Sequence, residues 1–286
     1  MEKLILVIGS NGQLALSFKK ICPKETKFLS SKELDLTNIK KINQILSFYK
    51  PKYIFNFAAY NKVDDAEKDK KNILINAEAV KEISNFCSEK DIFFLHVSTD
   101  YVFDGSIGNY CEEDNPSPIN AYGSAKLKGE NYIREICKKY IIIRTAWLYS
   151  NGKNNFLDAI RSQFSDQKDL KGANDIIGSP TSSDSLAEGI LMVYKKMQSQ
   201  SLSSGIYHFA NKGRTSKLEF VRKINKLLSK KINCKERKVI SVSNSDFDLK
   251  ADRPYDTSLN VNKFESEFGF IIPDWNEELT KIIEKI

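Results

Sequence analysis

The feature that most constrains the fold of this chain is the regular alternation of short apolar runs and longer amphipathic stretches in its first half. The first run, residues 4–8, is apolar throughout and ends at Gly9, which is typical of a strand buried on both faces. Short loops join the stretches, so the pattern predicts βαβ units in a doubly wound parallel sheet. The expected strands are residues 4–8, 27–29, 53–59, 92–97 and 140–144, and the expected helices are residues 13–21, 73–89 and 121–138, with another between Thr37 and Pro51.

The pattern weakens after Trp147, where glycine, proline and asparagine interrupt the chain more often. A length of 286 residues accommodates a full α/β domain with an appendage. We therefore predict an α/β fold of the Rossmann type, with a sheet domain over residues 1–150 and a smaller, partly interleaved part over residues 151–286. The elements expected in the smaller part are helices near residues 156–164, 185–197 and 217–228 and a strand over residues 205–210.

Composition and charge exclude several classes of protein. The 44 basic and 37 acidic residues give a formal net charge of +7, but only seven basic residues are arginine, and the lysines are scattered among acidic residues. A nucleic-acid-binding surface clusters such charges on one face, so we expect no nucleic acid partner. Five cysteines without a C-x-x-C pair and only two histidines argue against a disulfide framework and a zinc site. With no signal peptide and no apolar stretch of roughly 18 residues, we expect a cytoplasmic protein without a membrane partner.

A glycine turn directly follows the first expected strand. Gly9, Gly12 and Ala15 give the spacing G-x-x-G-x-x-A at the start of the first expected helix. Gly9 permits the tight turn, Gly12 lets the backbone approach a pyrophosphate, and Ala15 keeps the helix close to the sheet. The turn predicts a dinucleotide cofactor, although any tight strand-to-helix turn uses such glycines. The cofactor-binding residues expected here are Gly9, Asn11, Gly12, Gln13 and Leu14.

The end of the second expected strand bears on the choice between NADPH and NADH. A carboxylate there accepts hydrogen bonds from the ribose hydroxyls of NAD, whereas a basic residue suits the 2′-phosphate of NADP. Ser31 and Lys32 favour NADPH, with NADH as the alternative. We expect Asp35 and Leu36 near the adenine, where the carboxylate would accept from the exocyclic amine. The alternative is that Asp35 merely precedes a helix cap.

Three residues form a candidate catalytic group at the carboxyl edge of the expected sheet. Tyr122 and Lys126 lie one turn apart on one face of a helix, and Thr99 follows the fourth strand. A lysine ammonium and an oxidised nicotinamide would lower the pKa of the tyrosine phenol, which could then exchange a proton with a carbonyl oxygen. The Thr99 hydroxyl would hold the same oxygen. The group predicts proton transfer coupled to hydride transfer at a carbonyl.

These motifs resemble the extended short-chain dehydrogenase/reductases and, within them, the dTDP-4-dehydrorhamnose reductase family, over nearly the whole chain. The glycine turn and the Y-x-x-x-K spacing of Tyr122 and Lys126 mark the superfamily only. The string STDYVF over residues 98–103 and the RTAW string that ends at Trp147 are closer to the reductases.

The resemblance implies reduction of the C4 ketone of dTDP-4-dehydro-6-deoxy-L-mannose to dTDP-L-rhamnose, with NADPH or NADH. By the same resemblance, Tyr122 is the proton donor and Lys126 binds the nicotinamide ribose. The resemblance also implies that Ala58, Ala59, Tyr60 and Asn61 line the cofactor and that Val63, Thr99, Asp100, Trp147 and Asn155 contact the dTDP-sugar.

Arg253 is the residue we expect to bind the diphosphate of the substrate, because a guanidinium can bind two phosphate oxygens at once. The alternative is a surface ion pair with the neighbouring carboxylate of Asp252 or Asp256.

The chain departs from the family pattern at three places. Some members bind magnesium at a dimer interface through a glutamate where this chain has Ser17, so magnesium is doubtful and no metal site is expected. Lys217 stands where the family has a tryptophan after the serine, and Ile176 stands where it has a glutamine after the aspartate. These last two changes lie on the expected substrate side. The chain is expected to be a monomer or a homodimer.

Other functions of the same superfamily use the same tyrosine and lysine. A dehydratase needs an Asp-Glu pair directly after the threonine, and Tyr101 follows Asp100 here, so dehydration is not expected. Another nucleotide-sugar 4-ketoreductase or epimerase stays open, as does a non-catalytic NADP-binding regulatory subunit. Net consumption of NAD(P)H separates a reductase from an epimerase, and the intact Thr99, Tyr122 and Lys126 argue against a non-catalytic role.

Overall fold

The fold is built on one parallel sheet, seen in a computed structural model that describes residues 4–152, 154–199 and 203–286. Its six strands lie in the order β2 (Thr26–Leu29), β1 (Ile5–Ile8), β3 (Tyr53–Asn56), β4 (Phe93–Thr99), β5 (Tyr140–Thr145) and β10 (Gly205–His208). All neighbouring pairs are parallel, and strands are added outward on both sides of β1 and β3. This order is the doubly wound arrangement of the Rossmann type, so the predicted fold class is confirmed.

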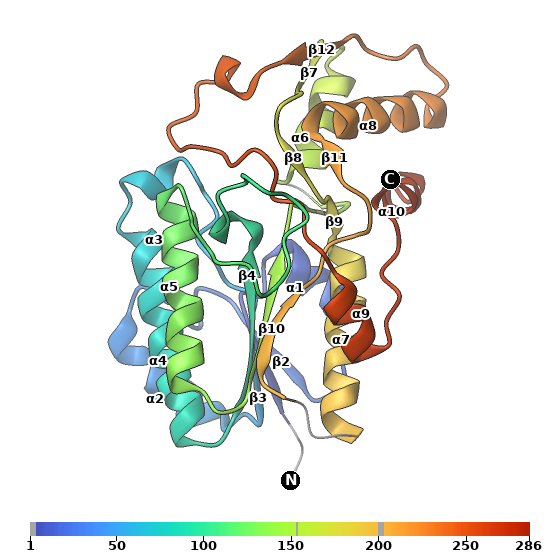
Figure 1. Cartoon of the computed structure of the whole chain (residues 1–286). Helices are drawn as coiled ribbons and strands as arrows, with labels where there is room; N and C mark the ends of the chain where they lie inside the picture. The colour runs from blue at the N-terminus through green and yellow to red at the C-terminus, as the bar shows by residue number, and fades with distance from the viewer. Residues whose placement is uncertain (1–3, 153, 200–202) are drawn as a thin grey trace.

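Helices cover both faces of the sheet (Figure 1). Side chains along β1 alternate between two cores, with Ile5 and Val7 on one face and Leu6 and Ile8 on the other. Both faces of the central strands are buried, which is why these strands read as continuous apolar runs. The first core is covered by α1 (Gln13–Phe18) and α7 (Ser183–Ser199), and the second by α2 (Ile39–Tyr49), α4 (Ala79–Glu89) and α5 (Ala121–Ile136).

The second half of the chain contributes to both parts of the molecule. Strand β10 extends the sheet, and α9 (Asn262–Phe268) packs beside it and α7, which is the interleaving predicted. The smaller part has a core of its own and lies beyond the carboxyl ends of the sheet strands (Figure 1). Its helices are α6 (Phe156–Ser165), α8 (Lys217–Lys231) and α10 (Trp275–Glu284). Its described strands form two-stranded sheets: β7 (Leu170–Ala173) pairs with β12 (Val239–Val242), β6 (Leu148–Tyr149) with β9 (Thr181–Ser182), and β8 (Ile177–Gly178) with β11 (Thr215–Ser216).

A wide helical turn interrupts the helix expected over residues 73–89. A π-helical turn, Leu74–Glu78, separates the short α3 (Lys71–Ile73) from α4. Helix α5 approaches closely here, since a Cβ built at Gly129 would lie 2.3 Å from the carbonyl oxygen of Asn76. The Asn76 side chain accepts from the Tyr60 N–H at 3.0 Å and donates to the Tyr60 carbonyl at 2.8 Å. The turn therefore joins α5 to the loop after β3, a contact that apolar periodicity does not encode.

Several elements end earlier than expected. The first helix ends at Phe18 and β10 at His208. Strand β3 ends at Asn56, because the Asn56 Oδ1 accepts from the Ala58 N–H at 3.1 Å and turns the chain out of the sheet. None of the helices in the described ranges is long and apolar enough to cross a membrane. The described ranges also contain three 3-10 turns, at Asp65–Glu67, Asp100–Val102 and Asn244–Asp246.

Candidate active site

A cavity of about 840 Å³ lies at the carboxyl edge of the sheet, lined by residues of both parts of the molecule. Ligands of doubly wound folds bind at this edge. The lining from the first 150 residues includes Gly12, Gln13, Leu14, Ala59, Asn61, Val63, Thr99, Asp100, Tyr122, Lys126 and Trp147, and the lining from the rest includes Phe156, Gly172, Lys217, Phe247 and Arg253.

The start of α5 brings Tyr122 to the end of β4. The Asn120 side chain accepts from the Gly123 N–H at 2.8 Å and caps the helix. A Cβ at Gly123 would lie 2.1 Å from the carbonyl oxygen of Tyr101, so only glycine lets the helix begin this close to the strand end. Tyr122 and Thr99 therefore line the same cavity although they come from separate elements.

The Tyr122 phenol is protonated at neutral pH. Burial raises its pKa to about 12, and the Asp100 charge adds to that shift while a hydrogen bond with Thr99 opposes it. This direction is opposite to the lowering expected from Lys126, because burial dominates and the Lys126 ammonium points elsewhere. In this state the phenol can donate a proton to an oxygen in the cavity.

Lys126 is held by the strand beneath it. Its Nζ donates to the Val97 carbonyl at 2.7 Å and lies 3.1 Å from the Nε2 of the fully buried His96. The Asn56 Oδ1 accepts from the Ala58 N–H, so the Asn56 amide group donates to the His96 Nδ1 at 3.1 Å. The single ring proton of neutral imidazole is then on Nε2, facing Lys126. Burial lowers the pKa of Lys126 to about 8, against the opposing effect of the Glu130 charge.

Asp100 lies directly after Thr99 and is buried. Its Oδ1 accepts from the Thr99 hydroxyl at 3.1 Å, and its Oδ2 accepts from the Thr257 hydroxyl. Burial raises the pKa of Asp100 to about 6, against the opposing effect of both hydroxyls and of the Lys217 charge. The group is mainly ionised at pH 7, and it orients the Thr99 hydroxyl.

The glycine turn fits a dinucleotide. Gly9 has φ +96°, and a Cβ there would lie 2.7 Å from the backbone nitrogen of Ala58. A Cβ at Gly12 would meet only the Gly9 carbonyl, at 3.4 Å, so the backbone stays open to a ligand. Three buried oxygens of cavity-lining residues have no hydrogen-bond partner among the described residues, and a bound polar group would satisfy them. They are Gln13 Oε1, Ser98 Oγ and Thr145 Oγ1.

Five other residues expected to hold the cofactor lie outside the lining of the cavity. Ser31 and Lys32 are exposed after β2, while Leu36 belongs to the core. The Asp35 Oδ1 accepts from the Thr37 N–H at 2.9 Å, so Asp35 builds the turn before α2, as the alternative reading predicted. Asn11 is exposed in the glycine turn.

The loop after β3 contributes alternate residues to the cavity. Ala59, Asn61 and Val63 line it. Ala58 instead packs beneath Gly9, and the Tyr60 hydroxyl donates to Asp69 at 2.9 Å.

Trp147 lines the cavity in the left-handed backbone region, at φ +42°. The Lys217 ammonium lies 3.5 Å from the centre of its indole ring. A Cβ at Gly178 would lie 2.5 Å from the indole ring, so this glycine fixes where the ring can lie.

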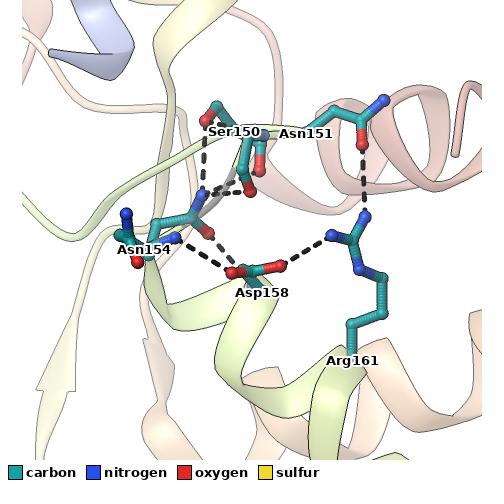
Figure 2. A network of polar contacts seen from close by, with 7 residues as sticks. Ser150, Asn151, Asn154, Asp158 and Arg161 are labelled. Carbon is teal, nitrogen blue, oxygen red and sulfur yellow. Dashed lines mark hydrogen bonds and ion pairs between the residues drawn. The ribbon is translucent and has the colours of Figure 1, made fainter. Parts of the chain in front are cut away.

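Asn155 lies outside the cavity lining, contrary to the expectation that it contacts the substrate. Its Oδ1 caps α6 by accepting from the Asp158 N–H at 3.2 Å, and its amide donates to the Ser150 and Gly152 carbonyls. Figure 2 shows the neighbouring contacts at the same helix end, where Asp158 accepts from Arg161. With these bonds made, Asn155 orders the loop before α6.

Arg253 lines the cavity and has an ion-pair partner that was not expected. Its Nη2 lies 2.8 Å from the Asp64 Oδ2, and its Nη1 donates to the Ala251 carbonyl at 2.9 Å. The structure does not show the alternative pair with Asp252 or Asp256: the carboxylate that pairs with Arg253 is that of Asp64, and Asp256 pairs with Arg214. Asp64 and Arg253 are far apart in sequence, so no local pattern signals their pairing.

Two residues at the site had no role assigned to them from the sequence. Thr257 holds Asp100 from 157 positions away, and nothing in its sequence surroundings indicates this. Lys217 drew attention only as a departure from the family pattern, and that departure was the available signal.

Ser17, which stands where some family members have a magnesium-binding glutamate, forms a contact between two helices. Its Oγ lies 2.8 Å from the Ser183 Oγ, across α1 and α7. Within the described ranges, no group of three or more histidine, cysteine, aspartate or glutamate residues could hold a metal ion.

Comparisons with known proteins agree with this geometry. The family described as "RmlD substrate binding domain" matches residues 2–286. A dTDP-4-dehydrorhamnose reductase of Aggregatibacter actinomycetemcomitans is 31% identical over 97% of this chain and 97% of its own. The chain belongs to the dTDP-4-dehydrorhamnose reductase family.

Two solved structures named as dTDP-4-dehydrorhamnose reductases share the fold over its full extent. The Bacillus anthracis reductase, in complex with NADP, is 32% identical with a TM-score of 0.90, and the match covers 100% of both chains. An orthologue from Clostridium acetobutylicum is 32% identical with a TM-score of 0.87, over 98% of both chains. Residues of this chain that differ from the family pattern, such as Lys217, therefore lie on a fold that the chain shares with these reductases.

Proposed function

We propose that this chain reduces the C4 ketone of dTDP-4-dehydro-6-deoxy-L-mannose to give dTDP-L-rhamnose, with NADPH as the preferred cofactor. The observation that carries the proposal is the cavity in which the Thr99 hydroxyl and the protonated Tyr122 phenol meet, in a chain of this family. The open backbone at Gly12 supports a dinucleotide, and the NADP in the Bacillus anthracis relative supports NADPH over NADH.

In the proposed mechanism, NADPH supplies a hydride when it is bound. Tyr122 donates its phenolic proton to the C4 oxygen, and its high pKa keeps that proton in place until the oxygen becomes basic. Thr99 would donate to the same oxygen once its single hydroxyl proton, which Asp100 accepts in this structure, turns toward the substrate. Lys126, held in place by the Val97 carbonyl, would bind a ribose hydroxyl of the cofactor.

The two parts of the chain divide the work. Residues 1–150 hold the cofactor and the proton donor, and residues 151–286 supply most contacts to the nucleotide. Val63 and Trp147 contact the sugar, and Arg253 binds the diphosphate while Asp64 holds it in position. We place the enzyme in the cytoplasm, where its five free cysteines would stay reduced, and the monomer or homodimer stays a prediction.

The test is the oxidation of NADPH and of NADH, followed at 340 nm, with dTDP-4-dehydro-6-deoxy-L-mannose and with its UDP analogue. We expect turnover that is fastest with NADPH and the dTDP substrate. Lys226→Met, which removes one positive charge from the exposed face of α8, should oxidise the cofactor at the wild-type rate. Absence of turnover with every combination contradicts the proposed reaction and favours a binding role.

A further inference from the structure

Lys217 lies in the candidate active site with unused hydrogen-bond donors. It is the first residue of α8, and the Ser216 side chain caps that helix by accepting from the Glu219 N–H at 3.1 Å. Its ammonium lies 3.5 Å from the centre of the Trp147 ring and 4.6 Å from that of Phe156. Aromatic faces attract a cation but leave its N–H groups without acceptors. Among the described residues, the ammonium has no hydrogen bond or ion pair.

The nearby charges do not neutralise Lys217. Asp100 is the carboxylate that faces it, but the Asp100 oxygens already accept from Thr99 and Thr257, and no ion pair forms. Arg253 lines the same cavity with a second positive charge, and the repulsion contributes to a low pKa for Lys217. Burial is the main cause and lowers this pKa to about 7. Two cations therefore line the same cavity.

An anion between the two cations would resolve both problems. It would accept the free N–H groups of Lys217, and it would offset the repulsion between the ammonium and the guanidinium. The substrate under the proposed function contains one such group, its diphosphate, whose two phosphoryl groups are both esterified and stay ionised across the neutral range. Arg253 already uses two of its five N–H donors on Asp64 and Ala251, so a second cation adds donors and charge for this group.

We propose that Lys217 is a substrate-binding residue that clamps the diphosphate of the nucleotide sugar together with Arg253, over the ring of Trp147. The inference rests on the proposed function for the identity of the ligand. It assigns a role to a lysine that replaces the tryptophan of the family pattern. Recognition of the diphosphate in this chain then depends more on charge than it would with tryptophan at this position.

The experiment measures binding by titration calorimetry, with dTDP-L-rhamnose and with a UDP-hexose as probes and NADP⁺ at saturation. Lys217→Met should weaken binding of dTDP-rhamnose by about 10- to 100-fold, the usual effect of a lost charge-assisted hydrogen bond to an ionised group. Lys226→Met removes the same charge from the exposed face of α8, and it should change the dissociation constant by less than about twofold. Lys217→Arg keeps a cation and should bind more tightly than Lys217→Met.

The pH dependence gives a second measurement. Only the protonated ammonium binds the anion, so the dissociation constant of the wild type should rise with pH above about 7, by up to about tenfold per unit. Lys217→Met should lose this rise, and because Lys126, Asp100 and Arg253 are unchanged in the variant, the difference isolates Lys217.

Three results would overturn the clamp: equal affinity of Lys217→Met and the wild type, an equal loss in Lys226→Met, or equally weak binding by the Arg and Met variants. Failure of the wild type to bind either probe would also overturn it. A wild type that binds dTDP-rhamnose but does not oxidise NADPH with the ketone contradicts only the proposed reaction, so the two failures are distinguishable.

Discussion

The two sides of the cavity differ in how their charged groups are held. On the sheet side, Lys126 and Asp100 each have partners within the chain. On the side of the smaller part, the Lys217 ammonium rests on aromatic rings with its donors free. The difference teaches that groups which would move or orient a proton are positioned in advance, whereas a group that would bind substrate keeps its capacity for the ligand.

The largest expected effect is on the sheet side, at the proton donor. Tyr122→Phe removes only the phenolic oxygen, and kcat should fall about 10²- to 10⁴-fold, as for other positioned general acids. Single-turnover kinetics with NADPH measures the chemical step. The dissociation constant for dTDP-rhamnose should stay within a few-fold of wild type, and unchanged turnover would show that Tyr122 is not the donor.

The second largest effect is expected from a change in the buried ion pair of Arg144 and Glu130. Arg144 and Glu130 are each about 1% exposed, and the Arg144 Nη2 lies 2.7 Å from the Glu130 Oε2. Glu130→Ala leaves a buried guanidinium with His208 at 3.5 Å, so the free energy of unfolding should fall by about 3–5 kcal/mol. Lys139→Ala breaks the exposed pair with Asp91 and is the matched control, with little effect expected in urea denaturation. Equal effects of the two changes would contradict this ranking.

A change at Asp100 should show whether the buried carboxylate that positions Thr99 lowers the free energy of unfolding. Its folded pKa of about 6 lies above the unfolded value of 3.8, so its ionisation opposes folding above pH 6, and this penalty disappears as the pH falls toward 4. Asp100→Asn should raise the free energy of unfolding by about 1–2 kcal/mol at pH 8 and by less at pH 5, while it lowers kcat. Urea denaturation at both pH values measures this, and a loss of stability at pH 8 would contradict it.

The smallest effect should come from the cap that begins α5. Asn120→Ala removes the acceptor for the Gly123 N–H and should reduce the free energy of unfolding by about 1 kcal/mol. Because Tyr122 lies in the first turn, kcat should fall more than stability alone explains. Asn155→Ala removes the equivalent cap of α6 outside the cavity, and kcat should then be unaffected.

The sequence predicted what local patterns determine. Runs buried on both faces, such as residues 4–8, were recognisable as strands, and the glycine turn at Gly9 and the helical spacing of Tyr122 and Lys126 located one edge of the cavity. What it missed depends on residues distant in sequence. The π-helical turn at Asn76 follows from the approach of Gly129, and nothing near Thr257 indicates its bond to Asp100.

The direction of the Tyr122 pKa could not be read from spacing either. A lysine one turn away suggested a lowered value, but the Lys126 ammonium is directed at Val97 and His96, and burial dominates at the phenol. Spacing along a helix gives proximity of backbone positions, and the direction of a long side chain depends on acceptors supplied by other strands.

The measurement that tests the central claim most directly is the stoichiometry of the reaction. Purified wild-type protein is incubated with excess NADPH and a known amount of dTDP-4-dehydro-6-deoxy-L-mannose, and NADP⁺ and dTDP-L-rhamnose are quantified by chromatography. The account predicts one NADP⁺ formed for each dTDP-L-rhamnose, and no product from Tyr122→Phe on the same timescale. Conversion of the sugar without net oxidation of NADPH, or no conversion at all, would contradict it.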